Sequence, residues 1–386
     1  MTGAPGAERE TWRARLLFVH AHPDDETLTT GVTMAAYAAC GHDVHVLTCT
    51  LGEEGEVIPA ALAHRASGRD DTLGTARREE LRAAMAVLGV EHSVLGEDHT
   101  LGVASRYRDS GMADSSSALH PDAFALADLG EAAAMVAAHI TALRPDVVVT
   151  YDQQGGYCHP DHIQTHRVTM SALSALSAAP ALAGADRMAV PAAFCILTAR
   201  SWASQDRLWL QANVALTSSS CIVLQQDAPY PPSVVSDEVV TNVVDEPDFV
   251  ETQSRALAEH RTQVTVHEGY YVLSNHIAAR LSGREGFARF DPVAGHLVPA
   301  ALGVPRRTGL LPGPPGSRMT PDAPDTPDTP DMDAFRRAMS RFATGVTVLT
   351  TRVRDLDHAM TASATDLGVP GTAAPARLRR TRGALP

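Results

Sequence analysis

The chain has 386 residues, of which 44% are hydrophobic, and its formal net charge at pH 7 is -13. This length allows about two domains with a sizeable core, while the negative charge argues against a nucleic-acid or anionic-membrane partner. All 32 basic residues are arginine, which excludes the lysine-dependent chemistries of P-loop NTPases, Schiff-base enzymes and protein kinases.

Apolar, β-branched stretches alternate with amphipathic ones along most of the chain. The run 15–21 predicts a buried strand, and the segment 29–40 predicts a helix. Further strands are expected at 42–49, 145–152, 192–199 and 238–245. Further helices are expected at 75–90, 128–143, 159–176 and 248–262, with loops at 51–75 and 101–127. This alternation implies an α/β fold, a Rossmann-like parallel-sheet sandwich with helices on both faces.

The composition changes near residue 304. Residues 311–332 contain "TPDAPDTPDTPD", which is typical of a proline-rich disordered linker. The segment 333–367 predicts a helix and then a strand, too short to enclose a core alone, and the remainder predicts disorder. We therefore expect a main domain at 1–310, a linker at 311–332 and a short, incomplete tail at 333–386.

Two further features concern the environment of the protein. No apolar run approaches 18 residues, and the N-terminal stretch lacks the apolar core of a signal peptide, so we expect a cytoplasmic protein without a membrane span. The five cysteines form no C-x-x-C pair, which argues against a zinc knuckle or a dithiol redox motif.

Two clusters of ionisable residues follow predicted strands. The first is "HAHPDDE" at 20–26, and the second is "YDQQGGYCHPDHIQTH" at 151–166, where Gly155 and Gly156 would permit a sharp turn. Ligands of open α/β sheets gather beyond the carboxyl ends of the strands. We therefore expect the two clusters to form one site.

The residue types in these clusters predict a metal centre. Two imidazoles and a carboxylate suit a divalent ion with positions left for water. His22 and Asp25 are three residues apart, so one turn can direct both toward one point, and His162 can complete the set. Asp24 then remains free to take a proton from the attacking water and to deliver it to a leaving group.

A simpler interpretation is that the clusters are surface charges that cap helix N-termini, but two clusters with the same H-P-D sequence disfavour it. Within them, we expect His20 to pack in the interior. His166 is expected to be solvated or to support a ligand, and Cys158 to be incidental.

"AHPDDE" (21–26) together with "HPDH" (159–162) resembles the zinc-dependent deacetylase family that includes LmbE-like and PIG-L-like N-acetylglucosaminyl deacetylases. Further similar stretches are "VHVLTCTLGEEGEV", "RDSGMA", "RPDVVVTYDQQGGYCHPDH" and "HRTQV", and the resemblance spans about 13–303. Within the family, the chain is most similar to members of the mycothiol pathway. The resemblance thus implies hydrolysis of the acetamide of N-acetylglucosaminyl-inositol, a small glycoside, with release of acetate.

The resemblance also implies roles for individual residues. His22, Asp25 and His162 would bind one zinc ion, or ferrous iron, and Asp24 would be the general base and then the acid. His159 would stabilise the oxyanion or assist protonation. Tyr157, on a mobile loop, would polarise the carbonyl. The sugar–inositol pocket would be lined by Arg77, Asp109, Met112 and Gln263. Without the resemblance, Arg77 and Asp109 would be read as surface charges and Met112 as loop packing.

The chain departs from the family at two places. Cys158 stands where a small residue such as glycine is expected. In the tail, "FRRAMSRFATGVTVLTT" and "HAMTASA" resemble the opening of flavin reductase-like domains, but the match is short, so we interpret it as a truncated domain that is inert toward flavin.

Three alternatives stay open: a mycothiol S-conjugate amidase or a deacetylase of another amino sugar, a flavin-linked oxidoreductase, and an inactive sugar-binding module. The turn 27–31 reads TLTTG, without the lysine expected of conjugate amidases. Its threonine hydroxyls would suit a neutral pseudodisaccharide.

Overall fold

The computed structural model describes residues 12–178, 189–214, 221–300 and 304–311, together with the backbone of a hairpin at 346–353 and 356–363. The chain divides into two units, Met1–Pro314 and Pro315–Pro386. Each unit is described by itself.

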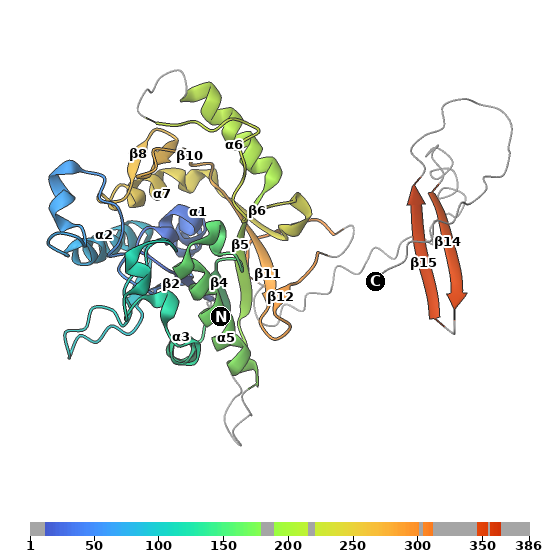
Figure 1. Ribbon diagram of the computed structural model, residues 1–386, viewed down its shortest axis with the longest axis horizontal. Coiled ribbons are helices and arrows are strands. Elements are labelled where there is room, and N and C mark those ends of the chain that lie inside the picture. Colours follow the sequence, from blue (N-terminus) through green and yellow to red (C-terminus); the bar gives the residue numbers. More distant parts are fainter. Residues whose placement is uncertain are drawn as a thin grey trace, which may run out of the picture. The chain divides into compact units, whose positions relative to one another are not determined.

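The first unit is built around a mixed ten-stranded sheet (Figure 1). Its main strands follow the order β13-β7-β11-β5-β4-β1-β2-β3, while β12 pairs with β11 and β6 with β5. The strands are β1 (Arg15–His20), β2 (Asp43–Thr48), β3 (Glu91–Val94), β4 (Val147–Thr150), β5 (Ala192–Ala199), β6 (Val234–Val235), β7 (Asn242–Asp245), β11 (Arg284–Asp291), β12 (His296–Leu297) and β13 (Arg307–Thr308).

The strand order reverses between β1 and β4. From β1 the chain proceeds outward to β2 and β3, then returns to the other side of β1 to form β4 and β5, and all these pairings are parallel. The carboxyl ends of β1 and β4 are therefore adjacent at a topological switch point, which is where open α/β sheets bind ligands.

Helices cover both faces of this sheet, as predicted (Figure 1). Successive side chains of β1 point to opposite faces. Leu16 and Phe18 belong to one core cluster, which includes residues of α1 and α2, whereas Leu17 and Val19 belong to another, which includes residues of α3 and α5. The helices are α1 (Asp25–Ala39), α2 (Leu73–Leu88), α3 (Leu129–Leu143), α4 (Gly155–Cys158), α5 (Pro160–Ala178), α6 (Arg200–Asn213) and α7 (Val250–Leu257).

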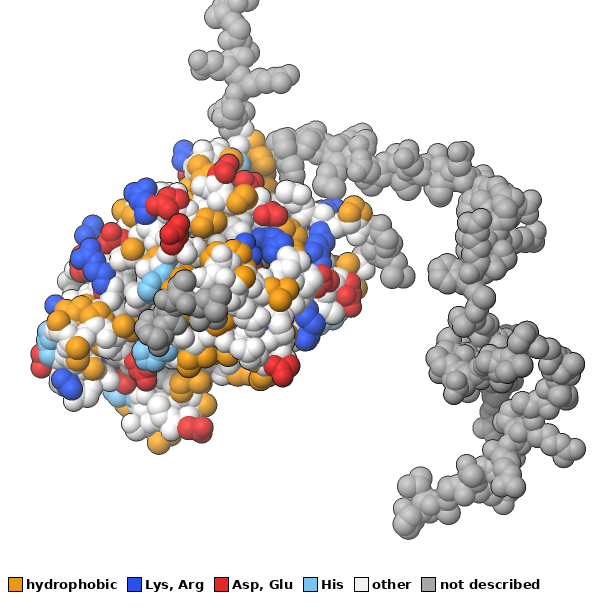
Figure 2. Space-filling model, turned by 90° about the horizontal axis from the view of Figure 1, so that it is seen from above, with side chains coloured by type: hydrophobic (Ala, Val, Ile, Leu, Met, Phe, Trp, Pro, Cys, Tyr) orange, Lys and Arg blue, Asp and Glu red, His pale blue; other side chains and the backbone are white. Residues whose placement is uncertain are grey.

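Smaller elements complete the first unit. A separate antiparallel sheet contains three strands, β8 (Thr265–His267), β9 (Tyr270–Val272) and β10 (Ala278–Arg280). Short 3-10 helices are η1 (Ala60–Arg65), η2 (Ser116–Leu119), η3 (Phe124–Leu126), η4 (Asp237–Val239) and η5 (Pro247–Phe249). On the face shown in Figure 2, acidic and arginine side chains are interspersed among hydrophobic and uncharged atoms, so the net charge is not gathered into one patch there.

The structure corrects several predicted elements. The first helix begins at Asp25 rather than at 29, so Asp25 and Glu26 lie in its first turn. The strand expected at 238–245 is confined to its second half because η4 occupies the first half. The prediction omitted β3, α6 and β11. In addition, β11 runs antiparallel to both of its main neighbours, β5 and β7, so the sheet is mixed rather than purely parallel.

A buried carboxylate from β11 reaches the middle of α1. Glu285 accepts the backbone N–H of Val32 at 2.9 Å and that of Thr33 at 2.8 Å, groups that in an undisturbed helix bond only to carbonyls four residues earlier. Gln253 donates to the carbonyl of Thr27 at 2.9 Å. Burial raises the pKa of Glu285 to about 7. These side chains anchor α1 from β11 and α7.

The tail forms an antiparallel hairpin of β14 (Val346–Val353) and β15 (Leu356–Ser363). The single strand predicted in 333–367 is thus two strands, while the helix predicted before it and the linker at 312–332 lie outside the described residues. Among the helices of the described chain, none combines the length and the apolar composition that a membrane crossing requires.

Candidate active site

A cavity of about 1100 Å³ opens at the carboxyl ends of β1 and β4. The structure brings all ten residues singled out from the sequence to its wall, although they come from five separate stretches of the chain. They are His22, Asp24, Asp25, Arg77, Asp109, Met112, Tyr157, His159, His162 and Gln263.

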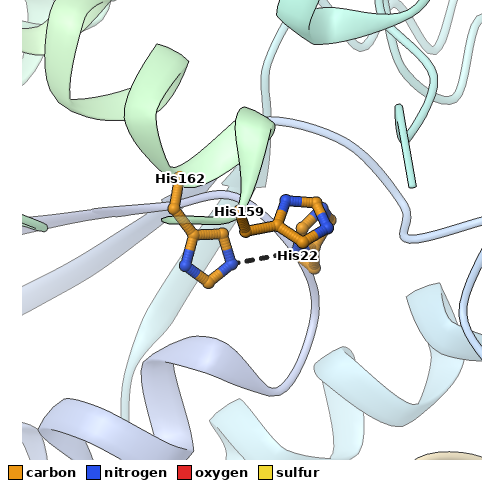
Figure 3. A group of neighbouring side chains, drawn as sticks. All are labelled: His22, His159 and His162. Carbon is orange, nitrogen blue, oxygen red and sulfur yellow. Dashed lines mark hydrogen bonds between the residues drawn. The ribbon is translucent and has the colours of Figure 1, made fainter. Parts of the chain in front are cut away.

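Three candidate ligand atoms form a nearly equilateral triangle. Asp25 Oδ2 lies 3.2 Å from His22 Nδ1 and 3.2 Å from His162 Nε2, and the two nitrogens are 3.3 Å apart. Figure 3 shows the contact between His162 and His22. Tetrahedral ligands at about 2.0–2.1 Å from a zinc ion lie roughly 3.3 Å from one another. The residues present therefore fit a divalent metal ion in both chemistry and spacing.

Asp161 orients the His22 ring. His22 Nε2 lies 3.2 Å from Asp161 Oδ2, and Asp161 in turn accepts the backbone N–H of Ser110 at 2.8 Å and the Ser110 hydroxyl. A carboxylate behind a histidine fixes the proton on the nitrogen that faces it. With an ion bound, the proton of a neutral His22 would lie on Nε2, and the lone pair of Nδ1 would be directed into the triangle.

Asp109 also approaches His22 Nε2, at 3.4 Å. Its carboxylate accepts the backbone N–H of Gly111 at 2.8 Å and that of Glu54 at 3.2 Å. Burial alone would raise the pKa of Asp109, but the contact with His22, the Gly111 N–H and the charge of Arg77 hold it well below its usual range. Asp109 is therefore an ionised acceptor at the cavity wall, not the surface charge that its sequence context alone suggested.

His159 lies beside the triangle with its ring centroid 4.8 Å from that of His22 and 4.9 Å from that of His162 (Figure 3). Its Nδ1 accepts the backbone N–H of Asp161 at 3.2 Å, which leaves the ring proton on Nε2. Burial, together with the neighbouring imidazoles, lowers the pKa of His159 to about 3. The ring is thus a neutral N–H donor.

Asp24 occupies an unusual backbone conformation. Its φ of 119° and ψ of -34° lie outside the regions open to ordinary L-residues, at a cost on the order of 1–3 kcal/mol. Its Oδ1 lies 3.2 Å from Arg77 Nη2. Burial raises the pKa of Asp24 to about 6, against the opposing charge of Arg77.

Arg77 is buried and is engaged mainly by the protein. It donates to the carbonyl of Pro23 and, at 2.8 Å, to that of Gly52. Gly52 has a φ of +64°, and a Cβ there would lie 2.1 Å from Arg77 Nη1, so glycine is required for the guanidinium to enter. Through its hydrogen bond to Pro23, Arg77 links the start of α2 to the turn that precedes α1.

Two buried residues next to Asp24 had no predicted role. Glu26 and His260 are both fully buried, and His260 Nε2 lies 3.3 Å from Glu26 Oε1. Burial disfavours the charged form of each residue, but the interaction between the two outweighs the effect of burial. The pKa of Glu26 is therefore lowered and that of His260 is raised. Glu26 belongs to the first charged cluster and His260 opens the "HRTQV" stretch, yet only the fold brings them together.

The turn before α5 is irregular. Gly155 and Gly156 have φ of +63° and +75°, which confirms the predicted sharp turn, and Cys158 has φ of +72°. A Cβ on Gly155 would lie 2.7 Å from the His162 Cβ. Tyr157 is 51% exposed, and its ring centroid lies 5.0 Å from that of His162. Cys158 is also exposed and occupies a backbone conformation that favours glycine, the residue type expected there.

The expectation that threonines after the first cluster offer hydroxyls to a sugar is wrong for Thr27 and Thr30, whereas Thr29 does line the cavity. Thr27 and Thr30 are fully buried, and the Thr27 hydroxyl donates to Glu26 Oε1 at 2.6 Å. The Thr29 and Thr30 hydroxyls donate to helical carbonyls at 2.7 Å. In a helix that begins at Asp25, all three hydroxyls are taken up within the protein.

The other histidines of the clusters are buried. His20 contacts the Tyr151 hydroxyl at 3.3 Å and the Thr30 hydroxyl at 3.2 Å, in agreement with its expected interior position. His166 is not solvated: its Nδ1 lies 2.9 Å from the Tyr151 carbonyl. The Tyr151 ring stacks on His162 at 4.2 Å, so these groups support a candidate ligand.

The chain is similar to known proteins over most of its length. The GlcNAc-PI de-N-acetylase family matches residues 17–173. The 1D-myo-inositol 2-acetamido-2-deoxy-alpha-D-glucopyranoside deacetylase of Thermobispora bispora is 44% identical over 303 residues, covering 78% of this chain and 95% of that protein. The protein of the same name from Thermobifida fusca is 45% identical over 273 residues, covering 71% of this chain and 91% of its own. Among solved structures, N,N'-diacetylchitobiose deacetylase from Pyrococcus horikoshii aligns with a TM-score of 0.41 and 17% identity, over 64% of this chain and 70% of its own.

Proposed function

Because the chain belongs to the GlcNAc-PI de-N-acetylase family of metal-dependent deacetylases, we propose that it hydrolyses the acetamide of N-acetylglucosaminyl-inositol. The products are acetate and glucosaminyl-inositol, an intermediate of mycothiol biosynthesis. Curated relatives that carry the name of this activity support the substrate. In the structure, the observation that carries the proposal is the triangle of His22, Asp25 and His162, together with the carboxylate of Asp24, which is paired with Arg77 at the same cavity wall.

His22, Asp25 and His162 would hold the metal ion, for which zinc is the first candidate and ferrous iron the alternative. When bound, the ion would supply Lewis-acid polarisation of the amide carbonyl and a nucleophilic water. Asp24 accepts the proton of the attacking water and then donates it to the departing amine, a role for which a carboxyl with a raised pKa is suited.

His159 donates its Nε2–H to the oxygen of the amide carbonyl as negative charge develops there. The backbone N–H of Asp161 at His159 Nδ1 supports this assignment over a proton-transfer role, because it keeps the ring neutral. Tyr157 assists from the exposed turn. The sugar and the inositol contact Asp109, Met112 and Gln263, and Arg77 contributes by holding Asp24.

We also propose that catalysis resides in residues 1–310, that 311–332 is a linker, and that the tail at 333–386 is a truncated flavin reductase-like segment without a catalytic role. The division of the chain after Pro314 supports this boundary. Leu310 is buried and its N–H donates to the Tyr37 hydroxyl. A truncation should therefore retain these residues and end at Pro314. The shortened protein should keep its activity, and copurifying flavin in the full chain would contradict the inert tail.

The test is release of the free amine from N-acetylglucosaminyl-inositol, free N-acetylglucosamine and a mycothiol S-conjugate, measured on one preparation with and without chelator. The proposal requires the highest kcat/KM for the inositol glycoside and loss of activity in chelator. A higher kcat/KM for cleavage of the conjugate would identify an amidase instead.

A further inference from the structure

The peptide bond between Pro23 and Asp24 is held at both of its polar ends. Its carbonyl accepts a hydrogen bond from Arg77 Nη2, and its N–H donates to Glu26 Oε2 at 3.0 Å. An amide at this position precedes the first helical turn and has no acceptor within the helix. Together, Arg77 and Glu26 fix the plane of this peptide, and with it the φ of 119° at Asp24.

Glu26 can hold this amide only if its own carboxylate is held. It is fully buried, and its second oxygen accepts the Thr27 hydroxyl at 2.6 Å and faces His260 Nε2 at 3.3 Å. A buried carboxylate requires a countercharge or a full set of hydrogen bonds. Thr27 supplies one bond, and His260, which follows α7, presents its Nε2 to the same oxygen.

We propose that Glu26 and His260 are positioning residues for the general base, which hold the Asp24 backbone in the conformation that places its carboxylate beside the metal ligands. This inference rests on the proposed role of Asp24. It assigns a function to the glutamate that closes the "AHPDDE" motif and to a histidine outside the family match at 17–173.

The arrangement is more specific than a buried ion pair that only stabilises the core. Such pairs contribute little net stability compared with apolar residues of the same size. Here the Glu26 carboxylate accepts the backbone N–H of Asp24, which lies between the candidate ligands His22 and Asp25. The backbone of His260 also belongs to the turn that carries Gln263, since the Gln263 N–H donates to the His260 carbonyl at 3.0 Å. One turn thus supports the base and brings Gln263 to the cavity wall.

The experiment compares Glu26→Gln, His260→Gln and His260→Ala in the full chain. Misplacement of the base should lower kcat by roughly 10- to 100-fold, with KM and metal content unchanged. His260→Gln can keep an N–H donor near Glu26, so it should retain more activity than His260→Ala. Loss of the metal from Glu26→Gln would overturn the proposal, because Glu26 would then act through Asp25.

The decisive measurement adds Glu26→Gln and His260→Gln to Asp24→Asn. Residues that act through Asp24 should cause no further loss of kcat once its carboxylate is gone. An equal loss of kcat in both backgrounds would show a merely structural role and overturn the inference. If Glu26→Gln fails to fold, His260→Gln provides the same comparison.

Glu285→Gln is the matched control, because it removes another buried carboxylate that accepts N–H groups of α1. Any effect of this substitution on kcat should be the same with Asp24 and with Asn at position 24. If Asp24→Asn alone keeps full activity, the proposed base is wrong and the inference fails with it. If Asp24→Asn loses activity while Glu26→Gln keeps full activity, the inference is wrong but the proposed role of Asp24 stands.

Discussion

The turns after β1 and after β4 both leave ordinary backbone geometry, but they differ in how they are held. In the first turn, the polar atoms of Asp24 are bonded to Arg77 and Glu26, and the residue is 8% exposed. In the second turn, Tyr157 is 51% exposed and Cys158 is exposed as well. The first turn therefore holds a fixed group, whereas the second presents an exposed side chain at the cavity wall.

The largest expected effect tests whether the two turns share one metal ion. His162→Ala removes the only member of the ligand triangle that the β4 side contributes, so the ion and the activity should be lost together. The checks are metal content by elemental analysis and acetate release. An active protein without metal would show that the two turns do not share a metal ion that the activity requires.

The next effect separates two adjacent carboxylates of the first turn. Asp24→Asn should retain the metal and lose roughly 10²–10⁴-fold in kcat, the usual contribution of general acid–base catalysis. Asp25→Asn should weaken metal binding itself. Metal content and kcat are measured for both proteins. The roles are reversed if Asp24→Asn empties the site and Asp25→Asn leaves it full.

A smaller effect concerns recognition of the sugar. Asp109 is ionised and lies at the cavity wall, so Asp109→Ala should reduce the preference for the inositol glycoside over free N-acetylglucosamine. A lost hydrogen bond to a charged group corresponds to about a tenfold change in kcat/KM. Because Asp109 also contacts His22, metal content must be measured alongside. Equal kcat/KM values for the two sugars in the unaltered protein would show that Asp109 does not recognise the inositol group.

The smallest effect tests the strain of the second turn. Cys158→Gly should raise the free energy of unfolding by about 1 kcal/mol, because glycine adopts a φ of this sign without steric cost. Cys158→Ala is the control, since it removes the thiol but keeps the strain. The measurement is denaturant unfolding of both proteins. Equal stability of the two would mean that the turn carries no strain at Cys158.

The sequence predicted the parts of the site that depend on position along a strand. The apolar runs of β1 and β4 are unmistakable, and the residues after them must meet at one edge of a parallel sheet. Hence His22, Asp25 and His162 could be grouped without a structure. Arg77, Asp109, Met112 and Gln263 were found only through the family resemblance, because nothing in their local sequence distinguishes them from surface charges or loop residues.

Other parts depend on contacts that local patterns do not encode. The pairing of Glu26 with His260 joins a helix start to a distant turn. Strand β11 reads "REGFARFD", whose charged residues and glycine hide a buried central strand. The expected sugar contacts of Thr27 and Thr30 failed for a local reason: α1 starts four residues earlier than predicted, so these side chains are buried.

The return of the chain from β3 across β1 to form β4 has a consequence for synthesis on the ribosome. Synthesis proceeds from the N-terminus, and a domain generally folds as a unit. All three candidate metal ligands have been made once His162 is added, whereas His260 follows only after β5, α6 and α7. Glu26 therefore lacks its partner until most of the domain has been made, and the first turn can reach its final geometry only then.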